Sequence, residues 1–146
     1  KIGKRAFLCS GSLVNNTARD KKPYVLSAFH CTEDLEYNVS ASKEDYNQWM
    51  FYFHLEHTGC DNTSLIQNYK TIQGCSRVVA IPVENGSDGL LLLLNENIPD
   101  YFDVYFNGWD RTNSISLSGV GIHHPGGDVK KIYHLRKSFT FKCHLA

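Results

Sequence analysis

The sequence has no long hydrophobic run and no excess of charge of either sign. No apolar segment reaches the roughly 18 residues that a transmembrane helix needs, and the longest, Leu90 to Leu94, has the length of a strand. Lysine plus arginine number 15, and aspartate plus glutamate also number 15, with no basic stripe and no acidic run. These absences argue against a membrane span, and against nucleic acid or an anionic membrane surface as the main partner.

The chain also lacks an initiator methionine and a signal peptide, because it starts at Lys1. We therefore expect a processed or trimmed start. Its 146 residues are enough for one ordinary domain with a core. Five cysteines are many for this length and indicate an oxidising compartment, secreted or periplasmic. Because five is odd, one cysteine is unpaired or has its partner outside these residues.

Helix signals are few, while short β-branched and aromatic runs alternate with turn residues along the chain. This pattern predicts an all-β protein, an antiparallel sandwich or barrel. The segment "QWMFYFHLE" does not alternate cleanly, so we expect it to be buried on much of both faces, as at a barrel closure. The predicted strands lie in "AFLCSGSLV", "YVLSAF", "WMFYFHLE", "RVVAIPVE", "GLLLLLN", "DVYFNGW", "ISLSGVGI" and "KSFTFKC".

His30 stands directly before Cys31 at the end of the apolar run "PYVLSAFHC". Cys9 begins the run "CSGSLV", and the polar loop "NNTARDKK" separates the two runs. If the runs are neighbouring antiparallel strands, a Cys9–Cys31 disulfide is expected, and it would stabilise the fold by roughly 3 kcal/mol in the chain-entropy model. It would also hold the backbone beside His30, as a catalytic base requires.

Asp88 stands at the start of a strongly apolar strand, where an unpaired carboxylate would be expensive to bury. An imidazole N–H is a suitable partner, because an aspartate that binds Nδ1–H frees Nε2 to take a proton from a serine. Taken alone, His30 is more often a structural histidine and Asp88 more often a turn residue. Together, in the order His then Asp, they fit two members of a triad whose serine comes last.

Several segments carry a family resemblance. "CSGSLVNNTARDKKPYVLSAFHC" resembles the first strand pair of lysyl endopeptidases, within the trypsin-like serine proteases, and "SDGLLLLL" resembles their aspartate strand. "FNGWDR" and "GIHHPGGDVKKI" resemble segments that open their second barrel. The resemblance implies chymotrypsin-like antiparallel β-barrels: residues 1–100 as the first barrel and residues 101–146 as the incomplete start of a second. It implies endopeptidase activity on a protein or peptide substrate, with preference for lysine. His30 would be the general base and Asp88 its orienting carboxylate.

The serine nucleophile of that family, in a Gly-x-Ser-Gly turn, does not occur after Asp88. Ser118 precedes a glycine but lacks the rest of the turn. We therefore expect this chain to be the N-terminal portion of such a protease, inactive alone, with no cofactor and no metal. An incomplete second barrel exposes strand edges and apolar faces, so we expect a dimer, strand exchange or another partner to cover it.

The remaining cysteines and histidines allow alternatives. A Cys60–Cys75 disulfide is our preferred pairing, which leaves Cys143 as the odd cysteine. A zinc site is the alternative, although its spacing is unusual for structural zinc; its ligands would be His54, His57, Cys60 and Cys75. His123 and His124 are adjacent and would point to opposite faces of a strand, one packed and one solvated.

The aromatic residues are interpreted as core rather than as a ligand platform. They are Trp49, Phe51, Tyr52, Phe53 and Trp109. Asp110 and Arg111 are expected to form a local ion pair.

Two functions follow from these observations. The first is a secreted endopeptidase whose serine lies elsewhere, favoured by the presence of both His30 and Asp88. The second is a non-catalytic binding module on a protease fold, favoured by the missing serine. A small metal-binding β domain is a third and weaker hypothesis.

Overall fold

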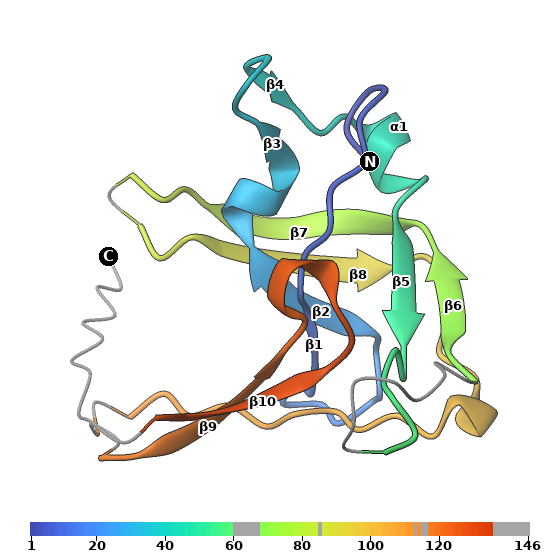
Figure 1. The fold of residues 1–146 in the computed structure, drawn as a ribbon, viewed down its shortest axis with the longest axis vertical. Coiled ribbons are helices and arrows are strands. Elements are labelled where there is room, and N and C mark those ends of the chain that lie inside the picture. Colours follow the sequence, from blue (N-terminus) through green and yellow to red (C-terminus); the bar gives the residue numbers. More distant parts are fainter. Residues whose placement is uncertain (60–67, 85, 113, 115–116, 136–146) are drawn as a thin grey trace.

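A computed structural model describes residues 1–59, 68–84, 86–112, 114 and 117–135. Its largest sheet has four strands, all antiparallel to their neighbours. These strands are β1 (Ser12–Val14), β2 (Tyr24–Ala28), β7 (Cys75–Ile81) and β8 (Gly89–Leu94). Their order across the sheet is β1-β2-β8-β7 (Figure 1).

The run of leucines forms β8, between β2 and β7. Because side chains alternate across a strand, Leu90, Leu92 and Leu94 share one face, and they are 0%, 1% and 4% exposed. The leucines between them are half-buried on the other face. This strand is therefore the centre of the core, whose buried members are Leu13, Val25, Tyr46, Ile72, Cys75, Leu90, Leu92, Leu94 and Phe102.

β1 and β2 form a hairpin around the polar loop at residues 15–23. The Oδ1 atom of Asp20 accepts hydrogen bonds from the side-chain amide of Asn16 at 2.7 Å and from the backbone N–H of Lys22 at 3.1 Å. Asp20 thus holds the loop by two local hydrogen bonds, although Oδ1 of Asn16 is buried without a partner. The predicted polar hairpin loop is confirmed.

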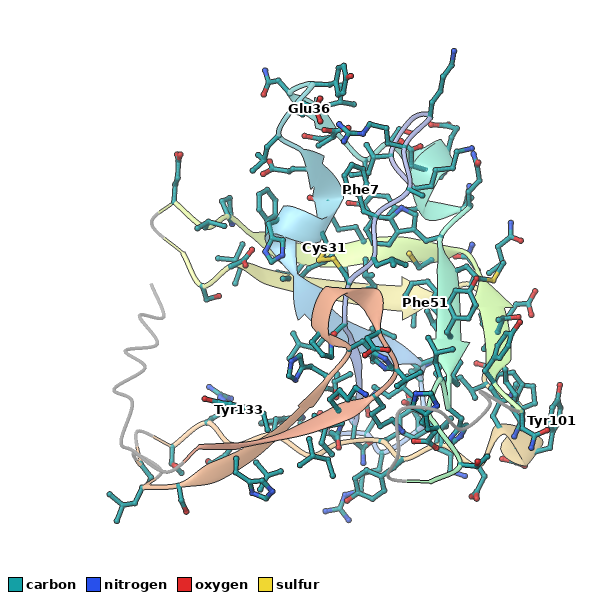
Figure 2. The ribbon with its side chains drawn as sticks, viewed as in Figure 1. Phe7, Cys31, Glu36, Phe51, Tyr101 and Tyr133 are labelled. Carbon is teal, nitrogen blue, oxygen red and sulfur yellow. A yellow bond between two sulfur atoms is a disulfide. The ribbon has the colours of Figure 1, made fainter. Side chains whose placement is uncertain are left out.

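Three smaller sheets have two antiparallel strands each. They pair β3 (Glu33–Asp34) with β4 (Val39–Ser40), β5 (Met50–Phe53) with β6 (Lys70–Gln73), and β9 (Gly119–His123) with β10 (Lys131–Leu135). In the last hairpin, Tyr133 is 56% exposed and lies at the periphery of the molecule (Figure 2).

Four short helical turns complete the described elements. They are η1 (Phe29–Thr32), α1 (Lys43–Tyr46), η2 (Asp100–Phe102) and η3 (Pro125–Gly127). The turn α1 was not predicted, although its start carries a capping box: the Ser42 hydroxyl accepts from the Asp45 N–H, and the Asp45 carboxylate accepts from the Ser42 N–H.

Strands are the main regular structure in the described part of the chain, with few helices, so the all-β prediction is confirmed. The chymotrypsin-like barrel is not seen there: the sheets are open, because β1 and β7 remain edge strands and the smaller hairpins do not continue their ladders. The division at residue 100 stays a prediction. No helix within the described ranges is long and apolar enough to cross a membrane.

The prediction that the segment around β5 is buried on both faces is wrong. Met50 and Tyr52 are 44% and 48% exposed, whereas Phe51 and Phe53 are partly buried against the core. Among the described strands β5 pairs only with β6, and the ring of Tyr52 on its outer face contacts the ring of Tyr69. Trp49 also packs against the core, so the core interpretation holds for three of these aromatic residues and fails for Tyr52.

Trp109 is not a core residue either. It is 53% exposed, and its indole N–H donates to the carbonyl of Asn15 at 3.0 Å. The Asp110 carboxylate accepts from the N–H and hydroxyl of Thr112 at 2.8 and 2.9 Å, in place of the expected ion pair with Arg111. Local hydrogen bonds thus satisfy groups that we expected to be buried or paired.

Cys75 carries a free, buried thiol, so the expected Cys60–Cys75 disulfide is wrong. Its Sγ donates to the carbonyl of Tyr46 at 3.7 Å, within the core. Burial raises the pKa of the Cys75 thiol to about 12. Cys60 and Cys143 lie outside the described residues.

Truncation of the central strand tests the assignment of the core. Leu92→Ala should lower the free energy of unfolding by about 2–5 kcal/mol, because it removes a fully buried side chain and leaves a cavity. Leu35→Ala removes a side chain that is 80% exposed and should change this free energy by less than about 0.5 kcal/mol. Urea unfolding measures both, and equal effects would contradict the assignment.

The Cys75 thiol should resist a maleimide in the folded chain and react after unfolding, because the thiolate is the reactive form and burial suppresses it. Peptide mapping by mass spectrometry distinguishes Cys75 from Cys60 and Cys143. Labelling of Cys75 in the folded chain, or a Cys60–Cys75 peptide pair in a non-reduced digest, would contradict this expectation.

Candidate active site

The pairing of β2 with β8 brings His30 and Asp88 together. In this ladder Ala28 lies opposite Gly89, so the residue after β2 and the residue before β8 meet at the same end of the sheet. The N–H of Phe29 donates to the carbonyl of Asp88 at 2.9 Å. His30 follows within η1, which begins directly after β2.

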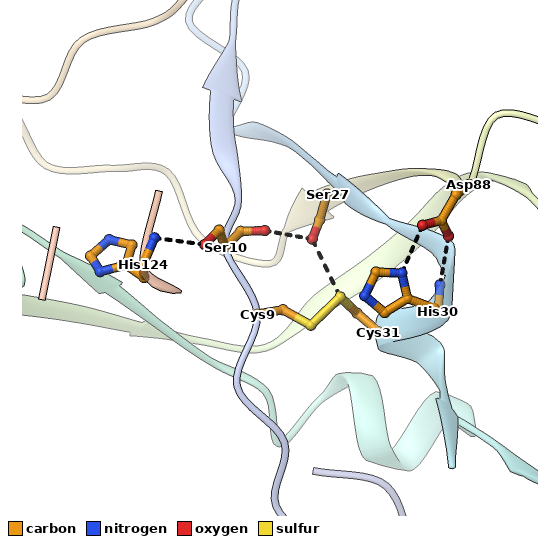
Figure 3. Close-up of a disulfide and its surroundings, with 7 residues drawn as sticks. All are labelled: Cys9, Ser10, Ser27, His30, Cys31, Asp88 and His124. Carbon is orange, nitrogen blue, oxygen red and sulfur yellow. Dashed lines mark hydrogen bonds and ion pairs between the residues drawn. A yellow bond between two sulfur atoms is a disulfide. The ribbon is translucent and has the colours of Figure 1, made fainter. Parts of the chain in front are cut away.

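The Asp88 carboxylate holds His30 at two points (Figure 3). Oδ2 is 2.7 Å from Nδ1 of the imidazole, and Oδ1 accepts the backbone N–H of His30 at 2.9 Å. Because an ionised carboxylate only accepts hydrogen bonds, Nδ1 is the donor and the neutral ring keeps its lone pair on Nε2. Asp88 has φ of 54°, a left-handed conformation that aspartate tolerates better than most residues.

The pair is more exposed than the sequence suggested. The His30 side chain is 57% exposed and that of Asp88 is 30% exposed. Partial burial raises the pKa of Asp88, but the hydrogen bonds from the backbone and ring of His30, together with the charge of the ring, outweigh burial and lower the pKa below its ordinary value. The contacts with His30 thus favour the ionised form of the Asp88 carboxyl group.

The expected Cys9–Cys31 disulfide is present, directly beside His30 (Figure 3). Next to it, the hydroxyl of Ser27 donates to the carbonyl of Ser10 at 2.8 Å. The hydrogen bond joins the segment before β1 to β2, and the disulfide joins the same segment to η1. The backbone on both sides of His30 is therefore fixed from a second direction.

The turn of the β9–β10 hairpin also reaches this segment. The N–H of His124 donates to the hydroxyl of Ser10 at 2.9 Å, and the His124 Nδ1 is 3.0 Å from the carbonyl of Asp128. A Cβ on Gly127 would lie 2.3 Å from the Leu8 side chain, so glycine permits this close approach. His124 is partly buried and His123 is exposed, as predicted, but no sequence signal indicated the contact with Ser10.

Of the alternative zinc ligands, His54, His57 and Cys75 are described, and these three do not form a metal-binding group. The ring of His54 lies 2.7 Å from the carbonyl of Phe102 through Nε2, while Cys75 lies in the core. His54 and His57 instead line a cavity of about 400 Å³ together with Glu56, Lys70 and Asp103, and this cavity does not include His30 or Asp88. Cys60 lies outside the described residues, and the exclusion of Ser118 as nucleophile stays a prediction.

The sequence also matches a known protein family. A protein-family model described as "Lysyl endopeptidase, C-terminal domain" matches residues 1–144. The chain belongs to this family. It is also 28% identical over 127 residues to a lysyl endopeptidase of Pseudomonas aeruginosa, an alignment that covers 86% of this chain and 25% of that protein.

Membership of the lysyl endopeptidase family confirms the resemblance seen in the sequence and supports a protease-related role. It also corrects one expectation, because the matching model is that of the C-terminal domain and not of an N-terminal portion. The chain spans about a quarter of the length of its curated relative. The disulfide and the family are compatible with an extracellular location.

The contacts of Asp88 should make stability depend on pH. Because its folded-state pKa is lowered, the stabilisation from its ionised form is present above the unfolded-state pKa of about 3.9 and is lost as pH falls through the folded-state pKa. The difference in unfolding free energy between the unchanged chain and Asp88→Asn should therefore be constant above about pH 5 and shrink below about pH 4. Urea unfolding at several pH values measures this difference. If the difference in unfolding free energy stays constant down to pH 2.5, the two His30 contacts do not stabilise the carboxylate.

Proposed function

We propose that His30 and Asp88 are the general base and the orienting carboxylate of a Ser-His-Asp endopeptidase site. The observation that carries the proposal is the double contact of Asp88 with His30, at 2.7 Å to Nδ1 and 2.9 Å to the backbone N–H. It fixes both the position and the tautomer of the ring, as acyl transfer requires. The nucleophilic serine is supplied by sequence outside these 146 residues.

In this mechanism Asp88 accepts Nδ1–H and leaves Nε2 of His30 to take the proton of the serine hydroxyl. The serine attacks the peptide carbonyl, and the imidazolium that forms is stabilised by the Asp88 carboxylate. His30 then gives its proton to the leaving amine. The exposure of the His30 ring, 57% of its side chain, leaves room for a serine and a substrate to approach.

The finer expectations belong to the same proposal. Residues 1–100 and 101–146 contribute to two chymotrypsin-like barrels that further sequence completes, the preferred substrate residue is lysine, and the protein is secreted or periplasmic. The family match and the Cys9–Cys31 disulfide support these points.

A binding module is the second candidate, and one observation favours it. The β9–β10 hairpin exposes a set of large apolar side chains, which suits a partner or a second copy of the chain. They are Val120, Ile122, Ile132 and Tyr133, each at least 56% exposed.

Kinetics of the whole protein that contains these residues distinguish the two candidates. Isolated from its source, it should cleave lysyl peptide substrates. Asp88→Asn should lower kcat by about 10⁴-fold, because the His30 ring is no longer held in the tautomer that leaves Nε2 free to accept a proton. Asp100→Asn changes a fully exposed aspartate, 102% by side chain, and should leave kcat unchanged.

The 146 residues alone should show no turnover. Cleavage by this chain with a fluorophosphonate label on Ser118 would overturn the assignment of the nucleophile. A whole protein that cleaves no peptide, or one whose kcat survives Asp88→Asn, would favour the binding module.

A further inference from the structure

Cys9, Cys31 and His30 form the one group of metal-ligand side chains found within the described residues. One ligand atom from each lies within 4.8 Å of the other two. In the oxidised chain the two sulfurs are bonded to each other, so neither is the thiolate that binds metals. The group therefore cannot bind a metal ion while the disulfide is intact.

We propose that reduction of this disulfide creates a zinc site formed by Cys9, Cys31 and His30. A dithiol reductant supplies two electrons and two protons: the Cys9–Cys31 bond breaks, two thiols form, and the reductant becomes a disulfide. Zn²⁺ then displaces the two thiol protons, so that two Zn–S bonds and one Zn–N bond form and two protons pass to solvent.

The dimensions of the group suit zinc. Tetrahedral zinc with Zn–S of about 2.3 Å and Zn–N of about 2.0 Å separates its ligand atoms by roughly 3.5–3.8 Å. The present ligand atoms lie within 4.8 Å of one another, and the two cysteine Cα atoms are 6.3 Å apart. After reduction, small side-chain rotations bring the sulfurs to this spacing without movement of the backbone.

The surroundings supply the rest of such a site. Asp88 already binds Nδ1 of His30, which leaves Nε2 for the metal (Figure 3). A carboxylate on the far nitrogen is the usual support of a zinc-bound histidine, because it orients the ring and raises its basicity. Cys9 and His30 are exposed, so water has access to the fourth position. Two sulfurs and one imidazole favour zinc over calcium or magnesium.

The same exposure gives a reductant access to Cys9, while Cys31 is only 9% exposed. A consequence follows that rests on the proposed function: zinc on Nε2 occupies the nitrogen that would take the serine proton. The reduced, zinc-bound protein would then be inactive. The redox state of the surroundings would decide how much of the protein is in this form.

Metal binding to a variant with only Cys9 and Cys31 tests the site. Cys60, Cys75 and Cys143 are changed to alanine, the chain is reduced with a dithiol, and the reductant is removed under anaerobic conditions. Titration with Zn²⁺, and with Co²⁺ as a visible probe, should give one equivalent per reduced chain and none per oxidised chain. Calcium should not compete.

Two further variants assign the ligands. His30→Gln should lose the imidazole ligand and bind zinc at least 10-fold more weakly, and Asp88→Asn should weaken binding by about 10–100-fold through the loss of support to the ring. Circular dichroism follows the fold throughout, and if the reduced chain unfolds without metal, zinc should refold it only when His30 is present. Binding unaffected by His30→Gln, or equal in the oxidised chain, would overturn the site. The result does not depend on peptide cleavage, so it is separable from the proposed protease function.

Discussion

The antiparallel pairing of β2 with β8 is the constraint on which the candidate site depends. His30 and Asp88 are separated by 58 positions in the chain, and they meet because Ala28 lies opposite Gly89. The buried leucines of β8 fix this register, since a shift by one residue would turn Leu90, Leu92 and Leu94 away from the core. The core and the site are therefore specified by the same ladder.

A second set of contacts fixes the site from outside this sheet. The Cys9–Cys31 disulfide ties the segment before β1 to η1, and Ser10 accepts the N–H of His124 from the turn of the β9–β10 hairpin. Cys9 and Ser10 thus link three segments that are distant in sequence, with His30 at one end of the group and His124 at the other (Figure 3). These links hold the segments together although the sheets to which they belong are small and open.

The sequence allowed prediction of the features that depend on residues close together in the chain. The polar loop between β1 and β2, the leucine strand and the disulfide follow from patterns within about 20 residues, and the pairing of His30 with Asp88 followed from family motifs. Barrel closure, the outer face of β5 and the exposure of Trp109 depend on which strands cover which faces. No local pattern contains that information, and the hydrogen bond between Ser10 and His124 joins backbone to side chain across 114 positions without any sequence signal.

Orientation and burial of the His30–Asp88 pair have separate causes. Three hydrogen bonds to Asp88, from the N–H of Phe29, the N–H of His30 and Nδ1, position the pair although both side chains remain accessible to water. Charges interact more strongly once water is removed, so a substrate that covers the ring would strengthen a geometry that already exists. This chain thus supplies the orientation of the two groups, and a ligand bound over them would supply the low dielectric. The same openness allows a metal to reach the ring.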